Sequence, residues 1–194
     1  GWAVGAFGTL VTTEDGGQHW VNQDSKLDNP DQFHLNTVTG DGKGRVLIAG
    51  EGGVLFRSDS KDGGRSWSLI LKGPNLSTGC SSLSMDPKDP GKLFAALWDF
   101  RRKGWTFRSG GESPTATSAS ALMVTRDGGQ TWAEVTPEKN KGFAQKPYGR
   151  IAVNVAPSDS KRVYAFVESP QSALYVSDDG GATWEARDRS QWMV

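Results

Sequence analysis

The sequence has few of the residues that form disulfides and metal centres. Cys80 is the single cysteine, and His19 and His34 are the only histidines among 194 residues. One cysteine cannot form an internal disulfide or a cysteine-based zinc cluster, and no other metal-ligand cluster is apparent. We therefore expect no metal site. A single cysteine does not indicate whether the protein resides in an oxidising or a reducing compartment.

The sequence also lacks an excess of charge and a long apolar run. Lys and Arg together number 22, as do Asp and Glu, so bulk charge does not favour nucleic acid or an anionic membrane as a partner. No apolar stretch approaches the roughly 18 residues of a membrane-spanning helix. Residues 1–3 do not begin a signal peptide. We expect no nucleic acid partner and no membrane insertion.

Glycine and tryptophan, by contrast, are abundant, at 25 and 8 residues. This composition favours tight turns and large apolar anchors, and hence an all-β protein. Four segments share the pattern Ser/Thr-x-Asp-Gly-Gly-x-x-Trp, with their key residues at Thr13, Asp15, Gly17, Trp20, Ser60, Asp62, Gly64, Trp67, Thr125, Asp127, Gly129, Trp132, Ser177, Asp179, Gly181 and Trp184. A fixed repeat is the strongest pattern in the chain.

Each repeated segment has the chemistry of a hairpin turn. The Asp can accept hydrogen bonds from its own turn, the glycines can take positive φ, and the Trp re-enters the sheet. Short β-rich runs flank each segment, so each joins two antiparallel strands. Because the glycine pairs follow Asp in hairpins and do not open a helix, no phosphate-binding loop is present and no cofactor is expected.

Two further strands precede each of the last three segments, for example residues 35–39 and 45–49 before Ser60. Four-stranded units repeated in this way are typical of β-propeller blades. We predict a single propeller unit over 1–194, with blades at 1–24, 33–72, 79–137 and 149–188. Blade 1 lacks its inner strand, and residues 190–194 could supply a closing strand.

The repeated pattern is that of the Asp-box, or BNR repeat, which recurs in sialidases, some glycoside hydrolases, sortilin-type receptors and photosystem II assembly factors. The resemblance implies a β-propeller, and it implies that each box is a structural turn at the blade periphery, away from the ligand face. In the second box, Ser58 aligns with Thr13, Thr125 and Ser177, so two residues are inserted before Asp62.

The two halves of the chain resemble different relatives. Residues 1–72 look like blades of the photosystem II stability and assembly factor family, on the segments 1–5 and 46–55. Residues 76–194 look like sortilin-like secreted bacterial BNR proteins, on the segments 98–111 and 147–153. The chain is then either an engineered chimera of propeller fragments or a natural protein with divergent blades. A natural protein of this kind is expected to be extracytoplasmic or secreted, with its signal peptide absent from this chain.

Catalysis is not the expected activity. Sialidase chemistry needs an arginine cluster and a tyrosine nucleophile, but Tyr164 and Tyr175 lie within apolar strands and Tyr148 is the only other tyrosine. Inverting glycosidases need two carboxylates roughly 6.5 to 9.5 Å apart. The carboxylates that could serve are Asp99, Glu112 and Glu168. We predict no enzyme, with a glycoside hydrolase-like activity as the alternative.

The long segment between Leu97 and Ala121 carries the candidate binding residues, Trp98, Arg101, Arg102, Trp105 and Arg108. Exposed Trp and Arg are typical anchors of protein interfaces and also stack on sugar rings. The other interpretation is an aromatic plug over the propeller mouth. The arginine run is too short, and the chain too acidic elsewhere, to indicate nucleic acid.

Two function classes remain open. The first is a non-catalytic propeller scaffold or protein-binding module, natural or engineered. The second is a fragment of a secreted BNR-repeat glycan-binding protein or glycoside hydrolase. Exposed blade edges at each end predict self-association, with two copies forming an eight-bladed ring, or association with missing blades.

Overall fold

The computed structural model describes residues 1–59, 64–103, 106–111 and 115–190, and they form an all-β, antiparallel structure. The predicted all-β class is confirmed. Among these residues no helix has the length and apolar character needed to cross a membrane. The helical segments are single turns of 3-10 helix at Ala6–Gly8 (η1), Asp24–Lys26 (η2) and Glu51–Gly53 (η3).

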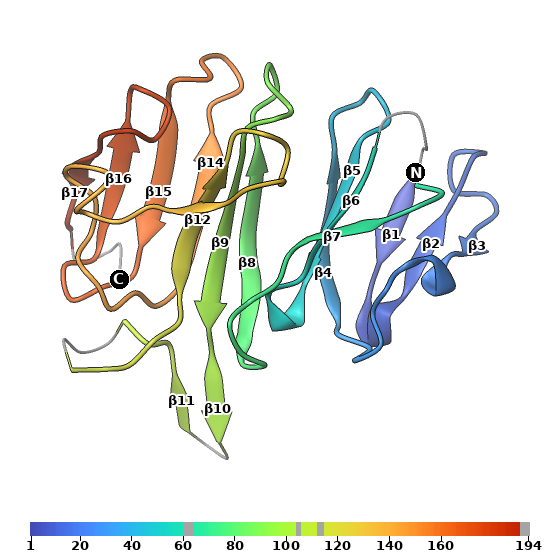
Figure 1. Cartoon of the computed structure of the whole chain (residues 1–194), viewed down its shortest axis with the longest axis horizontal. Coiled ribbons are helices and arrows are strands. Elements are labelled where there is room, and N and C mark those ends of the chain that lie inside the picture. The colour runs from blue at the N-terminus through green and yellow to red at the C-terminus, as the bar shows by residue number, and fades with distance from the viewer. Residues whose placement is uncertain (60–63, 104–105, 112–114, 191–194) are drawn as a thin grey trace.

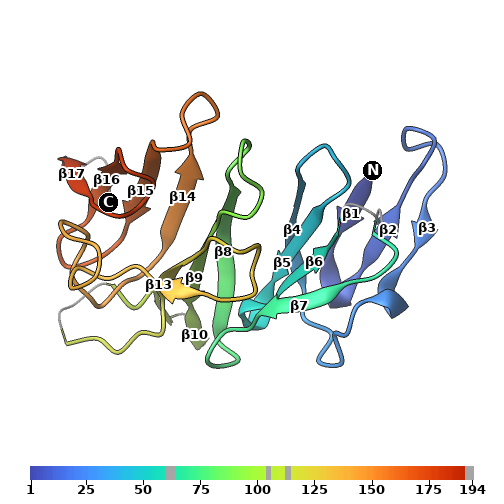
Figure 2. The ribbon, with the colours of Figure 1, turned by 45° about the horizontal axis from the view of Figure 1, so that its top comes forward.

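Four sheets stand side by side in chain order (Figures 1 and 2). Blade 1 has three strands, β1 (Trp2–Val4), β2 (Leu10–Thr12) and β3 (Val21–Asn22). Blade 2 has four strands, β4 (Leu35–Gly40), β5 (Val46–Gly50), β6 (Leu55–Ser58) and β7 (Ser68–Leu71).

The second half of the chain forms two more four-stranded sheets and a small hairpin. Blade 3 consists of β8 (Thr78–Met85), β9 (Leu93–Asp99), β12 (Ala121–Thr125) and β13 (Ala133–Glu134). Blade 4 consists of β14 (Ile151–Val155), β15 (Val163–Val167), β16 (Ala173–Ser177) and β17 (Glu185–Asp188). Between β9 and β12, β10 (Arg101–Lys103) pairs with β11 (Thr106–Arg108).

Apolar side chains fill the three spaces between neighbouring blades. Strands alternate the direction of their side chains, so one strand serves two cores. In β5, Ile48 packs toward blade 1, whereas Leu47 and Ala49 pack toward blade 3. In β9, Leu93 faces blade 2 and Phe94 faces blade 4. A blade that lost its neighbours would therefore expose one or both of these apolar faces.

Serine hydroxyls join the first strands of blades 3 and 4. Ser81 donates to the carbonyl of Ile151 at 2.9 Å, and Ser84 accepts from the amide of Val155 at 2.9 Å. Charged side chains add contacts between the same blades, since the Lys92 ammonium donates to the carbonyl of Ser160 at 2.7 Å. These contacts fix the position of blade 4 against blade 3.

The turns of each sheet divide between two ends. In blades 2, 3 and 4 the turns that join first to second and third to fourth strands lie at one end, and the turns that join second to third strands lie at the other. In three-stranded blade 1, the β2–β3 turn lies at the first end and the β1–β2 turn at the second. The β10–β11 hairpin extends from this second end (Figure 1). We call the first the box end and the second the loop end.

Within the described residues, the first edge of the row of blades is not covered by another blade. The Trp20 side chain of the first Asp-box is accordingly 47% exposed on blade 1. The closing strand expected over 190–194 falls almost wholly outside the described residues, and the predicted blade boundaries and dimer stay predictions.

Candidate functional site

The third Asp-box shows why its residues recur. Thr125 Oγ1 donates to Asp127 Oδ1 at 2.7 Å and accepts from the amide of Gly129 at 2.9 Å. The same carboxylate accepts from the amide and hydroxyl of Thr131, at 2.9 and 2.6 Å. Gly129 has φ of +95°, which disfavours any residue with a Cβ. The turn thus uses its own carboxylate to satisfy its own donors.

The first and fourth boxes repeat this geometry. Asp15 accepts from Thr13 Oγ1 at 2.8 Å and from the amide of His19 at 2.9 Å. Asp179 accepts from Ser177 Oγ at 2.8 Å and from the amide of Thr183 at 2.8 Å. These carboxylates are occupied by the turn, which is a structural role.

The second box is partly outside the described residues, which exclude Ser60 and Asp62. Ser58 Oγ accepts from the amide of Gly64 at 3.0 Å, six residues along the chain rather than four. Ser58 therefore stands where Thr125 stands in the third box, as the two-residue insertion requires. The Trp67 indole donates to the carbonyl of Gly64 at 3.1 Å, as the Trp184 indole does to Gly181 at 3.2 Å.

Hydrogen bonding keeps the box carboxyl groups ionised. Backbone and side-chain donors of His19 lower the pKa of Asp15, and the hydroxyl and amide of Thr131 lower the pKa of Asp127. Partial burial alone would raise the pKa of Asp179, but donors from Thr183 and Ser177 outweigh it and lower the pKa to about 2. A carboxyl group with such a low pKa is a poor general acid near neutral pH.

The loop end differs from blade to blade, unlike the box end. The β1–β2 turn of blade 1 places Phe7 at φ of +54°, where the β5–β6 turn of blade 2 has Gly52 at +66°. Phe7 is 72% exposed, and its ring contacts the ring of His34 at 4.9 Å between centroids. Gly52 instead leaves room for the ring of Phe33, which a Cβ would approach to 2.6 Å.

In blade 3 the corresponding turn is replaced by the long segment that includes β10 and β11. Trp98 lies near the end of β9, and its indole donates to the carbonyl and hydroxyl of Ser109 at 3.1 and 3.0 Å. Its ring contacts that of Phe100 at 4.6 Å and lies 5.4 Å from the Arg150 guanidinium carbon. Arg150 comes from the residue before β14, so blades 3 and 4 both contribute.

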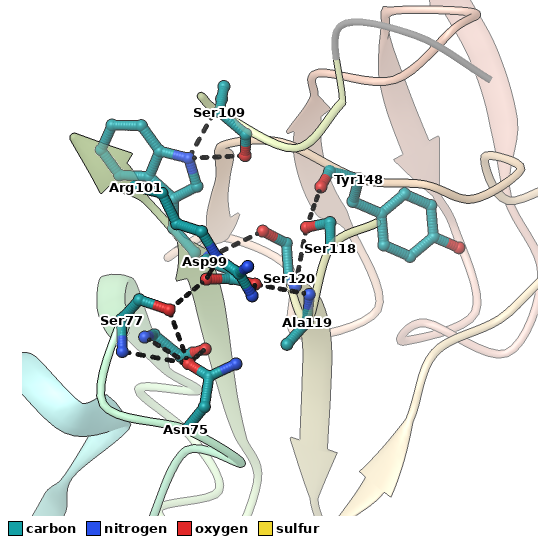
Figure 3. A network of polar contacts seen from close by, with 11 residues as sticks. Asn75, Ser77, Asp99, Arg101, Ser109, Ser118, Ala119, Ser120 and Tyr148 are labelled. Carbon is teal, nitrogen blue, oxygen red and sulfur yellow. Dashed lines mark hydrogen bonds and ion pairs between the residues drawn. The ribbon is translucent and has the colours of Figure 1, made fainter. Parts of the chain in front are cut away.

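A buried carboxylate organises this segment (Figure 3). Asp99 accepts from Ser77 Oγ at 2.6 Å, from Arg101 Nη2 at 3.0 Å and from the amide of Ala119 at 3.1 Å. The amide of Asp99 donates to Ser120 Oγ at 2.8 Å. Asp99 therefore ties both ends of the long segment to the end of blade 3.

The two described carboxylates of the glycosidase alternative are both engaged in structural contacts. Burial would raise the pKa of Asp99, but hydrogen bonds from Arg101, Ser77 and Ala119 outweigh it and hold the pKa below its usual range. Glu168 accepts from the hydroxyl of Ser109 and, at 2.9 Å, from the amide of Arg150. A general acid needs an elevated pKa, which Asp99 lacks.

A cavity of about 510 Å³ opens at the loop end. Its lining comes from blades 2, 3 and 4 and includes Phe33, Glu51, Leu76, Trp98, Phe100 and Arg150. Leu76 is 76% exposed, more than the other large apolar side chains exposed in the described part of the chain. An exposed apolar patch with polar residues at its rim is typical of a binding surface.

The predicted site residues are only partly gathered here. Trp98 lines the cavity, and Arg101 is bound to Asp99 beside it. Arg108 lies on β11, opposite Arg101 in the hairpin. Only the backbone of Arg102 is described, and Trp105 and Glu112 lie outside the described residues. Leu76 and Arg150 could not be recognised as site residues from the sequence, because they lie in short connections far apart in the chain.

The tyrosines do not form a nucleophilic site. Tyr148 is fully buried and donates to the carbonyl of Ala144 at 2.8 Å, and burial raises its pKa. Tyr175 is also buried, which raises its pKa as well. Tyr164 is 37% exposed on β15, whereas its neighbours Val163 and Ala165 are buried in the core shared with blade 3. Within the described residues, no group of three or more His, Cys, Asp and Glu could hold a metal ion.

Comparison with known families supports the repeat analysis. A family model described as photosynthesis system II assembly factor YCF48 matches residues 1–88, and a BNR/Asp-box repeat model matches residues 175–186. The predicted resemblance of the first blades is therefore confirmed. The resemblance of residues 76–194 to sortilin-like proteins and the chimera hypothesis stay predictions.

Two curated relatives are photosystem II assembly proteins. Ycf48 of Synechococcus sp. (strain CC9902), an assembly lipoprotein, is 31% identical over 138 residues, which are 70% of this chain and 34% of that protein. Ycf48 of Thermosynechococcus vestitus (strain NIES-2133 / IAM M-273 / BP-1) is 29% identical over 193 residues, which are 98% of this chain and 44% of that protein. The chain spans between a third and a half of the length of these relatives.

A solved GH74 xyloglucanase from Xanthomonas campestris has the same arrangement of sheets. The TM-score is 0.64 at 19% identity, over 95% of this chain and 27% of that chain. At this identity the likeness concerns the fold alone. Together with the family matches it confirms the predicted propeller, so the chain is a BNR-repeat β-propeller that resembles the photosystem II assembly factor.

Proposed function

We propose that this chain is a non-catalytic, protein-binding propeller module that acts in the assembly of photosystem II. Its binding surface is the loop end, made by the 510 Å³ cavity and the adjacent β10–β11 hairpin. The observation that carries the proposal is the contrast between the two ends. The Asp-box turns bind their own donors with their own carboxylates, whereas the loop end leaves the apolar side chains of Phe7 and Leu76 exposed.

The state of the carboxylates supports a role without catalysis. Asp99 is buried, and it is bound by Arg101 and Ser77. Glu168 is bound by Ser109 and the amide of Arg150. Neither is placed to protonate a glycosidic oxygen while it holds these partners. A binding role needs no such group, and it uses the exposed apolar and arginine side chains directly.

The experiment is a binding assay with purified photosystem II cores and purified unassembled subunits, with the chain immobilised. We expect retention of at least one subunit, weakened by Arg108→Gln on the hairpin and unchanged by Arg187→Gln on β17. Parallel incubation with xyloglucan should release no reducing sugar. Turnover of xyloglucan, or no binding of any subunit, would contradict the proposal.

A glycan-binding role is the second candidate, favoured by the cavity aromatic Trp98 and by the fold shared with a xyloglucanase. It predicts binding on a glycan array that is lost in Trp98→Ala. The array should include xyloglucan fragments. Absence of binding to every glycan would eliminate this candidate and leave the protein-binding role.

We also propose that two copies associate through their end blades, or that further blades cover these faces. Trp20 is 47% exposed at one end of the row, and Tyr164 is 37% exposed on the far face at the other end. Within the chain such faces are covered by the next blade. Light scattering on a sizing column should give a mass near twice 20.9 kDa, and a monomer at all concentrations would exclude the dimer.

A further inference from the structure

The hydroxyl groups in the wall of the loop-end cavity are already used as donors. Ser77 Oγ donates to Asp99 Oδ1 at 2.6 Å, and Thr78 Oγ1 donates to Asn75 Oδ1 at 2.8 Å. Ser81 Oγ donates to the carbonyl of Ile151 at 2.9 Å. A sugar needs several free donors and acceptors around its ring. These three hydroxyl groups therefore have no hydrogen left to donate to a saccharide.

The aromatic side of the cavity is held in a fixed orientation. The Trp98 indole is anchored by two hydrogen bonds to Ser109, and Phe100 lies against its ring at 4.6 Å with the planes tilted by 49°. Leu76 adds an exposed aliphatic side chain to the same lining. An ordered aromatic pair can bind an apolar side chain with little loss of conformational entropy.

Arg150 supplies the positive charge in the cavity lining. Its guanidinium lies over the Trp98 ring, with 5.4 Å between its central carbon and the ring centroid. None of the described carboxylates forms an ion pair with it. Glu168 accepts a hydrogen bond from the backbone amide of Arg150, and the Oε1 atom of Glu51 lies 3.8 Å from His34 Nδ1. A guanidinium over an aromatic ring retains donors that can bind a carboxylate.

We propose that this cavity binds a short linear protein segment that places an apolar side chain against the Trp98–Phe100 pair and a carboxylate against Arg150. The inference rests on the proposed protein-binding function and specifies its recognition chemistry. The cavity, about 510 Å³, is large enough for one or two large side chains, but not for a folded domain. The partner is therefore recognised through a loop or tail, with an apolar residue next to an Asp or Glu.

The test begins with a library of random seven-residue peptides, selected on the immobilised full chain. We expect enrichment of peptides with an aromatic or large aliphatic residue within two positions of an acidic residue. A selected peptide is then synthesised with serine in place of the apolar residue, or with the corresponding amide in place of the acid. Its affinity for the chain is measured by calorimetry.

Two substitutions at exposed cavity positions have matched controls elsewhere on the surface. Leu76→Ser should weaken the selected peptide about tenfold, whereas Leu69→Ser on β7 should not change its affinity. Arg150→Gln should reduce the preference for the acidic peptide over its amide form by about three- to fivefold, whereas Arg187→Gln should not. All four substituted side chains are exposed, so we expect the variants to keep the fold. Circular dichroism of each variant checks this.

The outcomes separate this inference from the proposed function. Selected peptides without an apolar and acidic pair, or affinities that neither cavity substitution changes, would overturn the inference. If photosystem II subunits still bind the chain in that case, the proposed function stands with a different recognition chemistry. If neither peptides nor subunits bind, both fail. A glycan that displaces the selected peptide would also overturn the inference, because the cavity would then be a saccharide site.

Discussion

The turns at the box end repeat from blade to blade, whereas the turns at the loop end of the same four sheets differ. At the box end the first, third and fourth turns repeat one set of hydrogen bonds, in which Thr or Ser and Asp satisfy the donors of their own turn. At the loop end, the equivalent turns hold Phe7 in blade 1, Gly52 in blade 2 and a hairpin in blade 3. Repetition here accompanies structural residues, and variation accompanies the candidate site.

This contrast has a physical cause. A turn that must pack in every blade needs the same positive-φ glycines and the same carboxylate each time. A loop that extends beyond the sheets is free of that packing constraint, so it can carry side chains for a partner. Substitutions at the box end should therefore lower stability, and substitutions at the loop end should lower binding.

The largest effect is expected where a box tryptophan is covered by a neighbouring blade. Trp132 packs in the core between blades 2 and 3, and its indole donates to the carbonyl of Ile70 at 2.8 Å. Trp132→Ala should lower the free energy of unfolding by about 3 to 5 kcal/mol, because it leaves a cavity. Trp20→Ala, at the exposed equivalent, should have a much smaller effect in chemical denaturation. Equal losses of unfolding free energy in the two variants would show that coverage by a neighbouring blade does not decide the contribution of a box tryptophan.

The box glycines should show a graded effect of the same kind. Gly129 and Gly16 both have positive φ, at +95° and +75°. A Cβ added to Gly129 would lie 2.6 Å from Ile70 Cδ1. A Cβ added to Gly16 would have none of the described atoms within 4 Å. Gly16→Ala should cost about 1 kcal/mol from backbone strain. Gly129→Ala should cost more, since strain and overpacking add. Thermal unfolding ranks the two, and the reverse order would contradict the packing.

Acid should weaken the box end through its carboxylates. The pKa of Asp179 is about 2 in the folded chain, below the value of about 3.9 for a free Asp side chain. Its contribution to stability is complete above about pH 4 and is lost as the pH falls toward 2. Asp179→Asn should flatten the stability profile in that window. Asp178→Asn, whose carboxylate pairs with Arg162, is the control, and a profile unchanged by Asp179→Asn would refute the account.

The smallest effect on stability is expected at the loop end. Leu76 is 76% exposed, so Leu76→Ser should change the free energy of unfolding by less than about 0.5 kcal/mol. Binding of photosystem II subunits should nevertheless weaken. A loss of stability comparable to that of Trp132→Ala would mean that Leu76 is a structural residue, and the contrast between the two ends would fail.

The repeated part of the molecule could be predicted from sequence because its causes are local. Asp127 and Gly129 lie within one turn, so spacing alone predicts the hairpin. The strands predicted at 35–39 and 45–49 agree with β4 and β5 to within one residue. The position of Trp20 could not be predicted in this way, because its exposure depends on whether another blade lies beside it, and no local pattern reports that.

The candidate site was harder to predict because it joins residues that are distant in sequence. Trp98 and Arg101 could be selected from the sequence, because they are an aromatic and a basic residue in a long segment between strands. Leu76 and Arg150 do not, because they come from the connections before β8 and β14, and only the packing of blades 2, 3 and 4 brings them to one cavity. The engagement of Asp99 by Ser77 and Arg101 could not be foreseen either, since it depends on the path of the long segment.

The most direct test of the contrast is to map a bound photosystem II subunit segment by nuclear magnetic resonance on the isotope-labelled chain. Chemical shifts should change for the Trp98 indole N–H and the Leu76 methyl groups at the loop end. The Trp132 and Trp184 indoles at the box end should not change. Shift changes confined to the box tryptophans would contradict the account, because the repeated turns would then be the binding surface.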